Sequence, residues 1–363
     1  DNVAIGTNAL DDLTTGADNV AIGAGTGLNL TTAANTIAIG HDAIGLGITT
    51  GTNNTAIGQD SGKALTAGLE NIFIGSMAGT AATDNENNIA IGHDAFAASA
   101  NDGDNNIAIG LSAMKTGDVS GLDNIAIGQL ALEDLSSGNL NIAIGKQAML
   151  QATDNLYNVA IGYRAMRDSD GAGDKNVIIG FQAAYQGDIS GNDNVAIGSQ
   201  ALQQLSTGAS AIGYESGYNI TTGINNVFIG KKSGTGGIVT GHNNIGLGVS
   251  SSANLTSGYD NIMIGVSAGA AATTNANNIL IGSGSDAPAG VNNAYALGTL
   301  TEVTQNDSLV LGGQTGARFR VGIGGMTAPN STLEVSGTLS VTGSALFSGS
   351  SAVGAQSGHN EGW

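Results

Sequence analysis

Asn124-Ile125-Ala126-Ile127-Gly128 is one copy of a string, N-[I/V]-A-I-G, that recurs almost from end to end of this 363-residue chain. Eighteen copies can be read, and most successive closing glycines are 17 or 18 residues apart. A period this short cannot hold a helix pair or a propeller blade, which need about 33 to 50 residues. The recurring Gly and the β-branched residues also disfavour a helix. The repeat therefore predicts an all-β protein, a parallel β-solenoid with one repeat in each coil.

The alternation within the string predicts two different strand faces, because successive side chains of a strand point in opposite directions. Ile125 and Ile127 share one face, and Ala126 and Gly128 share the other. We expect the Ile and Val residues to stack at about 4.8 Å spacing as the aliphatic core of the coils. Apolar residues before the turn are expected to close the far side of this core: Leu13, Ile48, Leu65, Leu135 and Leu255.

Under this assignment the alanines between the Ile and Val residues point out of the coil. A strand face in water normally carries polar side chains, so two apolar faces indicate a strand that is covered on both sides. We expect identical chains to cover this Ala/Gly stripe, and an exposed face of small residues is the alternative. A few copies carry a larger residue in the alanine position, and these are Phe73, Ile178, Phe228, Met263 and Leu280.

Two polar or small positions recur with the same period. The Asn of the string is present in fifteen copies, and stacked Asn amides can hydrogen-bond from coil to coil. Seven residues before the closing glycine stands Gly, as at Gly16 and Gly121, or Asn, as at Asn85. Because Gly and Asn tolerate positive φ, we predict a left-handed turn there, with altered turns at Ala33 and Ser206.

Composition and charge exclude several classes of function. The chain has no Cys, which removes disulfides, thiolate zinc sites and Cys nucleophiles. Lys and Arg total 10 against 29 Asp and Glu, a net charge of −19, so nucleic acid is not an expected partner. No apolar run approaches the ~20 residues that cross a bilayer, so we predict no membrane insertion by this chain.

The polar residues show no catalytic pattern, and we predict no enzyme and no catalytic, cofactor-binding or metal residue. His41 and His93 directly follow a closing glycine, in a position that Thr7 and Gln59 also fill, which indicates solvent exposure. The chain has no HExxH sequence and no Ser nucleophile elbow. Glycoside cleavage would need a carboxylate pair in a cleft, and Glu133-Asp134 stands in a predicted turn. Ice binding is a further alternative, disfavoured because Thr lies in turns.

Calcium is the one cofactor that we weigh. Acidic residues precede the repeated Asn in several coils, at Asp18, Asp104, Asp123, Asp174, Asp193 and Asp260. Stacked carboxylates at about 5 Å repel one another, which favours either a bound cation or dispersal among neutral copies. Neutral Asn does alternate with Asp in this position, and the nonapeptide signature of calcium-binding β-helices is absent.

The period fails after Gly298. Two strand-like pieces follow, at residues 308–312 and 319–324, and from Leu333 short apolar pairs alternate with Ser, Gly and Thr. This spacing is expected of a narrow shaft in which three chains intertwine. We therefore divide the chain into a β-roll repeat domain at 1–300, a transition and intertwined β-shaft at 301–349, and a weakly ordered tail at 350–363.

The repeats resemble the head repeats of the YadA-like trimeric autotransporter adhesins, which carry a similar N-[SN]-V-A-I-G signature. The longer copies, with Leu13-Thr14-Thr15-Gly16 or Ile48-Thr49-Thr50-Gly51, look like repeats of phage and algal-virus fibre proteins. The run V-G-I-G-G-x-x-x-P followed by L-E-V-S-G-T-L also looks like the segment before the self-cleaving chaperone of many phage fibres. Over residues 1 to about 300 the resemblance implies a left-handed parallel β-roll, packed as a parallel homotrimer.

The expected function follows from this resemblance. We expect a structural and adhesive trimeric fibre of a virus or phage, a tail fibre on the virion surface that contacts a host-surface receptor or glycan. The alternative is a bacterial trimeric surface adhesin or a self-assembling extracellular filament on the bacterial cell surface. A membrane-barrel anchor encoded downstream would favour the adhesin, and a chaperone domain there would favour the virus.

Overall fold

The structure, a computed structural model, describes residues 1–313 except 100–102, 170–172, 187–190, 204–208 and 238. It also describes two short strands further on, β20 (Val321–Ile323) and β21 (Leu333–Val335). The chain divides into two compact units, Asp1–Thr315 and Gly316–Trp363. The rest of the predicted shaft, and the whole predicted tail at 350–363, lie outside the described residues.

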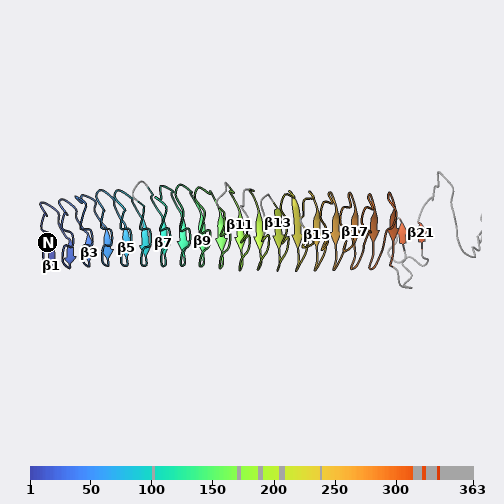
Figure 1. Ribbon diagram of the computed structural model, residues 1–363, viewed down its shortest axis with the longest axis horizontal. Coiled ribbons are helices and arrows are strands. Elements are labelled where there is room, and N and C mark those ends of the chain that lie inside the picture. Colours follow the sequence, from blue (N-terminus) through green and yellow to red (C-terminus); the bar gives the residue numbers. More distant parts are fainter. Residues whose placement is uncertain are drawn as a thin grey trace, which may run out of the picture. The chain divides into compact units, whose positions relative to one another are not determined.

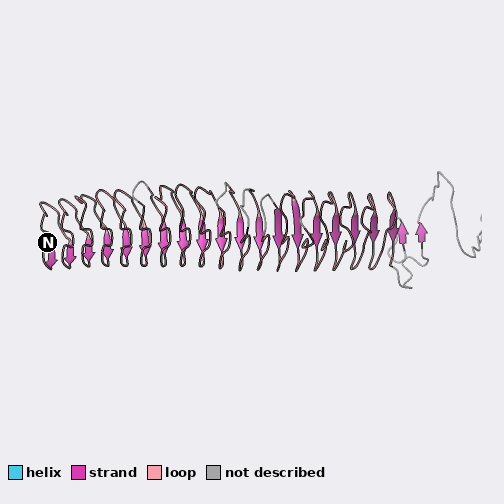
Figure 2. Cartoon of the chain, viewed as in Figure 1, coloured by secondary structure: helices cyan, strands magenta, loops and turns pink. Residues whose placement is uncertain are grey.

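The first unit is an all-β parallel solenoid of about 17 residues per coil, as predicted. Each coil contributes one short strand and otherwise consists of turns, and the strands follow one another in a single row (Figures 1 and 2). The described residues contain no helix. The strands are β1 (Val3–Ile5), β2 (Val20–Ile22), β3 (Ile37–Ile39), β4 (Thr55–Ile57), β5 (Ile72–Ile74), β6 (Ile89–Ile91), β7 (Ile107–Ile109), β8 (Ile125–Ile127), β9 (Ile142–Ile144), β10 (Val159–Ile161), β11 (Val177–Ile179), β12 (Val195–Ile197), β13 (Ala209–Ile212), β14 (Asn226–Ile229), β15 (Ile245–Leu247), β16 (Ile262–Ile264), β17 (Ile279–Ile281), β18 (Tyr295–Leu297) and β19 (Leu309–Leu311).

The strands form one 19-stranded sheet in which each strand pairs in parallel with the next one along the chain. The register keeps the repeat aligned: Ile125 pairs with Ile142, and Ala126 with Ala143. The sheet includes β19, which pairs with β18 through Leu297 and Leu311, so the solenoid continues one coil past residue 300. In the second unit, β20 and β21 form a separate parallel pair.

The two strand faces are the reverse of the predicted arrangement. Ala126 is fully buried in the coil, and so are the other middle residues from β2 to β18, including Phe73 and Phe228. The Ile and Val residues on either side point outward; Ile127, for example, is 36% exposed. The prediction that Ile and Val form the core and that alanines form an outer stripe is therefore wrong. Alternation places two sets of side chains on opposite faces, but it does not say which face turns inward.

The small alanines fit because a second set of residues fills the coil from the opposite wall. Four residues after the closing glycine, Leu132, Met149 and Met166 are fully buried. A third column, seven residues after the closing glycine, contains the fully buried Leu65, Leu135 and Leu255 and the partly buried Leu13, as predicted. The prediction for Ile48 is wrong, because this side chain lies one position further along its turn and is 69% exposed.

Glycine is needed at two places in each coil, for two different reasons. The closing glycine has the positive φ that other residues rarely adopt, and at Gly110 this angle is +136°. A β-carbon on Gly110 would also lie only 2.6 Å from the carbonyl oxygen of Gly128. The glycine seven residues earlier does not have the positive φ that we predicted. At Gly121 a β-carbon would instead collide with the carbonyl oxygen of Gly138 in the next coil, so close approach of the backbones excludes larger residues.

The repeated Asn forms the predicted ladder. Asn124 Nδ2 donates to the carbonyl oxygen of Gly138 at 2.8 Å, and its Oδ1 accepts from the backbone N–H of Asn141 at 3.0 Å. The same pair of bonds joins Asn141 to Asn155 and Asn158 in the following coils. These side chains are buried, so each amide satisfies a donor and an acceptor that water does not reach.

Candidate functional site

The strand face is the most unusual surface of the solenoid. We use this name for the outward-pointing first and third residues of β1 to β19, counted in β13 and β14 as Ser210/Ile212 and Val227/Ile229. All of them are Ile, Val or Leu except Thr55, Ser210 and Tyr295, and none is charged. At a spacing of about 4.8 Å per coil, the two columns run for about 85 Å. Those more than a third exposed include Val3, Ile5, Ile37, Ile72, Ile91, Ile127, Ile212, Ile229, Ile281, Leu309 and Leu311.

Such a face is large for a surface in contact with water. Two columns of this length cover on the order of 600 Å², taking the separation of alternate strand residues as the width. Single chains rarely expose a contiguous apolar patch larger than a few hundred Å². The column directly after the closing glycine does not continue this face, because apolar residues such as Leu111 and Val249 alternate there with polar ones such as Gln59, Gln129 and Lys146.

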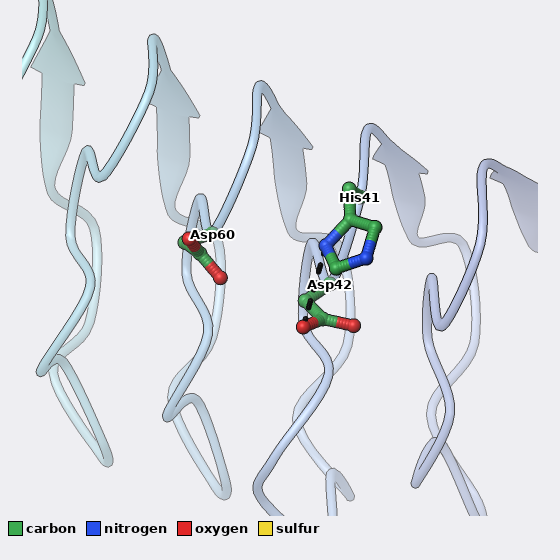
Figure 3. Close-up of side chains that lie close together, drawn as sticks. All are labelled: His41, Asp42 and Asp60. Atoms are coloured by element: carbon green, nitrogen blue, oxygen red, sulfur yellow. Dashed lines mark ion pairs between the residues drawn. The ribbon is translucent and has the colours of Figure 1, made fainter.

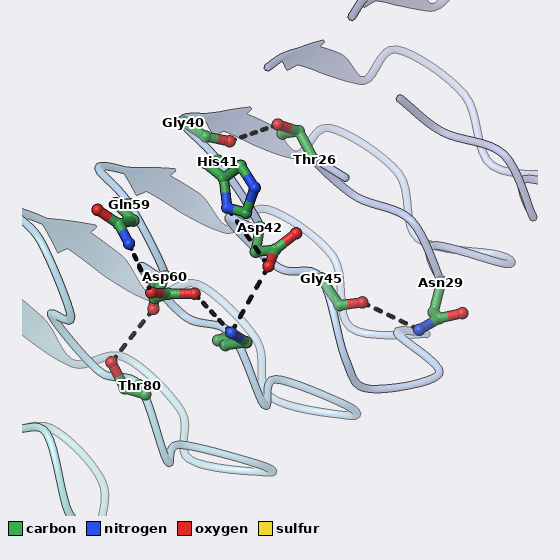
Figure 4. A network of polar contacts seen from close by, with 10 residues as sticks. Thr26, Asn29, Gly40, His41, Asp42, Gly45, Gln59, Asp60 and Thr80 are labelled. Carbon is green, nitrogen blue, oxygen red and sulfur yellow. Dashed lines mark hydrogen bonds and ion pairs between the residues drawn. The ribbon is translucent and has the colours of Figure 1, made fainter. Parts of the chain in front are cut away.

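A polar cluster lies in the turns that follow β3 and β4, where His41, Asp42 and Asp60 bring their ligand atoms within 4.8 Å of one another (Figure 3). His41 Nδ1 lies 3.4 Å from Asp42 Oδ2. The Lys63 ammonium lies between the two carboxylates, 2.6 Å from Asp60 Oδ1 and 3.6 Å from Asp42 Oδ2. Gln59 and Thr80 complete the contacts of Asp60 (Figure 4).

The electrostatics of this cluster favour an internal ion pair over a metal site. The hydrogen bond to Asp60 raises the pKa of Lys63, and the negative charges of Asp60 and Asp42 add to it, so the ammonium form is favoured. The same arrangement recurs three coils later, in the turns that follow β6 and β7. Asp94 Oδ2 lies 2.8 Å from Lys115 Nζ and 3.2 Å from His93 Nδ1. In both places a lysine from the next coil supplies the cation.

Two of the acidic residues considered for calcium accept hydrogen bonds from the backbone of a neighbouring coil. Asp104 Oδ1 accepts from the N–H of Glu86 at 2.7 Å, and Asp174 Oδ1 accepts from that of Leu156 at 2.8 Å. Directly before the repeated Asn, Asp123 and the equivalent residues of other coils have φ near +60°. Asp and Asn are the side chains that tolerate this conformation best. Their abundance in these turns thus has a conformational cause that does not involve an ion.

The remaining candidates for chemistry lie apart. His242 Nδ1 accepts a hydrogen bond from the N–H of Ile224 in the preceding coil at 3.1 Å. Glu133 has a raised pKa, because it is partly buried and lies beside Asp134. His359 lies outside the described residues. The carboxylates of Asp286 and Glu302 line one pocket together with Gly284 and Leu300, in the turns that follow β17 and β18.

No helix in the described residues is long and apolar enough to span a membrane. No model of a protein family matches the chain, and no curated protein matches its sequence.

Proposed function

We propose that the chain is a structural and adhesive fibre protein that assembles as a parallel homotrimer, and that it acts as a tail fibre of a virus or phage in attachment to a host. The strand face carries this proposal: about 85 Å of uncharged aliphatic side chains call for a partner of the same length. A second copy of the chain offers the same columns at the same coil spacing.

Charge supports identical copies as the partner. The chain has a net charge of −19, so two copies repel one another over most of their surfaces. The strand face has no charged residue, and it is the surface through which copies approach without placing carboxylates against each other. Parallel copies around one axis would bury this face by cyclic symmetry, and the number three comes from the resemblance of the repeats to those of the trimeric adhesins.

The contact that we propose differs from the one expected from the sequence. The alanines lie inside the coil, so the trimer would form through Ile and Val instead. Ala126→Lys would place a charge inside the coil, so it would disturb the folding of the coil and would not test the contact between copies.

The second candidate is a bacterial trimeric surface adhesin or an extracellular filament, which the same strand face would serve. Sequencing the genes beside this one separates the two: virion structural genes support the tail fibre, and a membrane-barrel anchor supports the adhesin. Electron microscopy of the purified protein tests the shared claim. We expect rods with three coils in cross-section, and rods one coil wide would contradict both candidates.

A further inference from the structure

Aromatic and arginine side chains gather on the turns that follow β10 and β11. Tyr163 and Phe181 occupy the position after the closing glycine in successive coils, and their rings stack with centroids 5.3 Å apart. The Arg164 guanidinium lies over the rings of both Tyr163 and Tyr185, 5.0 and 5.5 Å from their centroids. Arg167 lies over Tyr185 at 5.3 Å. We call these five residues the aromatic–arginine cluster.

Hydrogen bonds hold the two guanidinium groups in place. Arg164 Nε donates to Gln147 Oε1 at 2.7 Å, and Arg164 Nη1 donates to the Tyr185 hydroxyl at 3.2 Å. Arg167 Nη1 donates to the same hydroxyl at 2.8 Å. A guanidinium that is stacked on a ring and fixed at one edge presents its other N–H groups in a defined plane, which suits bidentate binding of a carboxylate.

The charge of the cluster sets it apart from the other coils. Arg164 and Tyr185 occupy the positions that Asp42 and Lys63 hold in the turns after β3 and β4, where carboxylate and ammonium neutralise each other. Arg167 has the carboxylate of Asp168 at 3.3 Å. Among the described residues, no carboxylate lies within ion-pair distance of Arg164; its partners are an amide and a phenol. In a chain of net charge −19, this is a site that favours an anion.

The cluster also offers an apolar platform that is open to solvent. Phe181 is 52% exposed, beside the stacked ring of Tyr163. Both follow a closing glycine and so lie beyond the strand face. Gln147 and Gln182 occupy the column of Arg164 in the coils before and after it, and the Gln147 amide contacts Arg164. Three coils, from Lys146 to Tyr185, span about 10 Å along the solenoid, enough for two sugar units.

We propose that the aromatic–arginine cluster binds an acidic saccharide. The C–H face of a sugar ring would stack on Phe181 and Tyr163, the carboxylate would accept hydrogen bonds from Arg164, and the hydroxyls would bond to the glutamine amides. This inference rests on the proposed function for its biological role, since it names the class of receptor that an attachment fibre would contact. An acidic peptide offers a carboxylate without the flat C–H face, so the platform favours the saccharide.

Calorimetric titration of the whole protein tests this. The probes are 3′-sialyllactose and trigalacturonate, which carry the carboxylate on two kinds of acidic sugar, with lactose as the neutral control and pentaglutamate as the peptide. We expect at least one acidic saccharide to bind about tenfold more tightly than lactose, because only the acidic saccharide makes a charge-assisted hydrogen bond to Arg164. Arg164→Gln and Phe181→Ala should each weaken that binding about tenfold.

The matched control is Lys231→Gln, which removes the cation from the Lys231–Tyr214 pair, in the column of Phe181 and Tyr163 and three coils further on. It should leave binding unchanged. Binding of neither acidic saccharide, equal binding of lactose, preference for pentaglutamate, or wild-type affinity in Arg164→Gln would each overturn the proposal. The mass of the assembly is measured on the same samples. A single chain that binds the acidic sugar overturns the trimer alone, whereas a trimer that does not bind it overturns this inference alone.

Discussion

The ring of Phe73 occupies the space that a β-carbon on Gly79 would need: such an atom would lie 2.7 Å from the nearest ring carbon. The same relationship joins Phe228 to Gly234, at 2.6 Å, and Met263 to Gly269. Coils with an alanine in the middle of the strand often have the opposite arrangement, with the large side chain in the turn. In the coil of β6, Phe96 fills the core from the position equivalent to Gly79. Each of these coils fills the same narrow space with one large side chain, from one wall or the other.

This exchange predicts that the large and the small side chain of one coil can trade places between the strand and the turn. Phe73→Ala alone should destabilise the solenoid by about 3–5 kcal/mol through a cavity. Gly79→Phe alone should also destabilise it, because the core is overpacked. The double variant reproduces the arrangement of β6, where Phe96 adopts a φ of +54°, close to the +60° of Gly79.

We therefore expect the double variant to unfold at a higher temperature than either single variant, with a coupling of about 2 kcal/mol or more. Circular dichroism at increasing temperature measures this. Additive losses would mean that the two positions do not share one space.

The Asn ladder predicts a large effect from a single amide. Asn124→Ala leaves the N–H of Asn141 and the carbonyl of Gly138 buried without their partner, at a cost of about 1–3 kcal/mol for each group. Asn139→Ala is the control, because Asn139 Oδ1 accepts from the N–H of Leu122 in an exposed place. We expect the thermal midpoint to fall clearly in the first variant only, and equal falls in both would count against the ladder.

The strand face predicts a separation of folding from assembly. Ile91→Lys/Ile109→Lys/Ile127→Lys places three charges on neighbouring strands, where the side chains already point outward. The coil should keep its circular dichroism spectrum. The concentration needed for assembly should rise at least about tenfold, because an unpaired charge buried between subunits costs several kcal/mol.

Ile48→Lys is the matched control, since Ile48 is also apolar and exposed but lies in a turn away from the strands. Sedimentation velocity over a range of concentrations compares the two proteins. Assembly of the triple variant at wild-type concentrations would show that the strand face is not the contact.

Asp286 predicts a dependence of stability on pH. Burial raises the pKa of its carboxyl above the usual 3.8, and the nearby charge of Glu302 adds to this, although N–H groups of Ala287 and Ala271 oppose it. The folded protein therefore binds this proton more tightly than the unfolded chain. The carboxyl's contribution to stability is most favourable below pH 3.8 and declines as the pH rises through the raised pKa.

Asp286→Asn removes that decline. Relative to the wild type, the variant should gain stability as the pH rises from about 3 to 7. Thermal midpoints of both proteins across this range measure the difference, in which the titration of the other carboxyls cancels. The pKa shift would be contradicted if the difference between the two thermal midpoints stayed constant with pH. It would also be contradicted if the wild type became more stable relative to the variant as the pH rose.

The sequence was sufficient for the fold class, because in-register Asn and glycine at a 17-residue period leave few alternatives. It was insufficient for the orientation of the strand, since Ile127 and Ala126 alternate equally well either way round. One signal could have decided it. Phe73, Phe228 and Met263 stand where the residue six positions later is Gly, which indicates that both point into one confined space.

The polar clusters were beyond sequence reasoning for a different reason. Lys63 meets Asp42 across 21 residues, and Arg164 meets Tyr185 across the same separation. These contacts depend on how neighbouring coils align outside the strands, which the repeat alone does not fix. The positive φ of the closing glycine, rather than of Gly121, also depends on how closely successive coils stack.

The central claim is that copies of this chain bury their strand faces against one another. Light scattering combined with size-exclusion chromatography measures the mass of the whole protein in solution. The account predicts a mass three times that of the 35.7 kDa chain. A folded species with the mass of a single chain, at micromolar concentration and with the strand face in water, would contradict it.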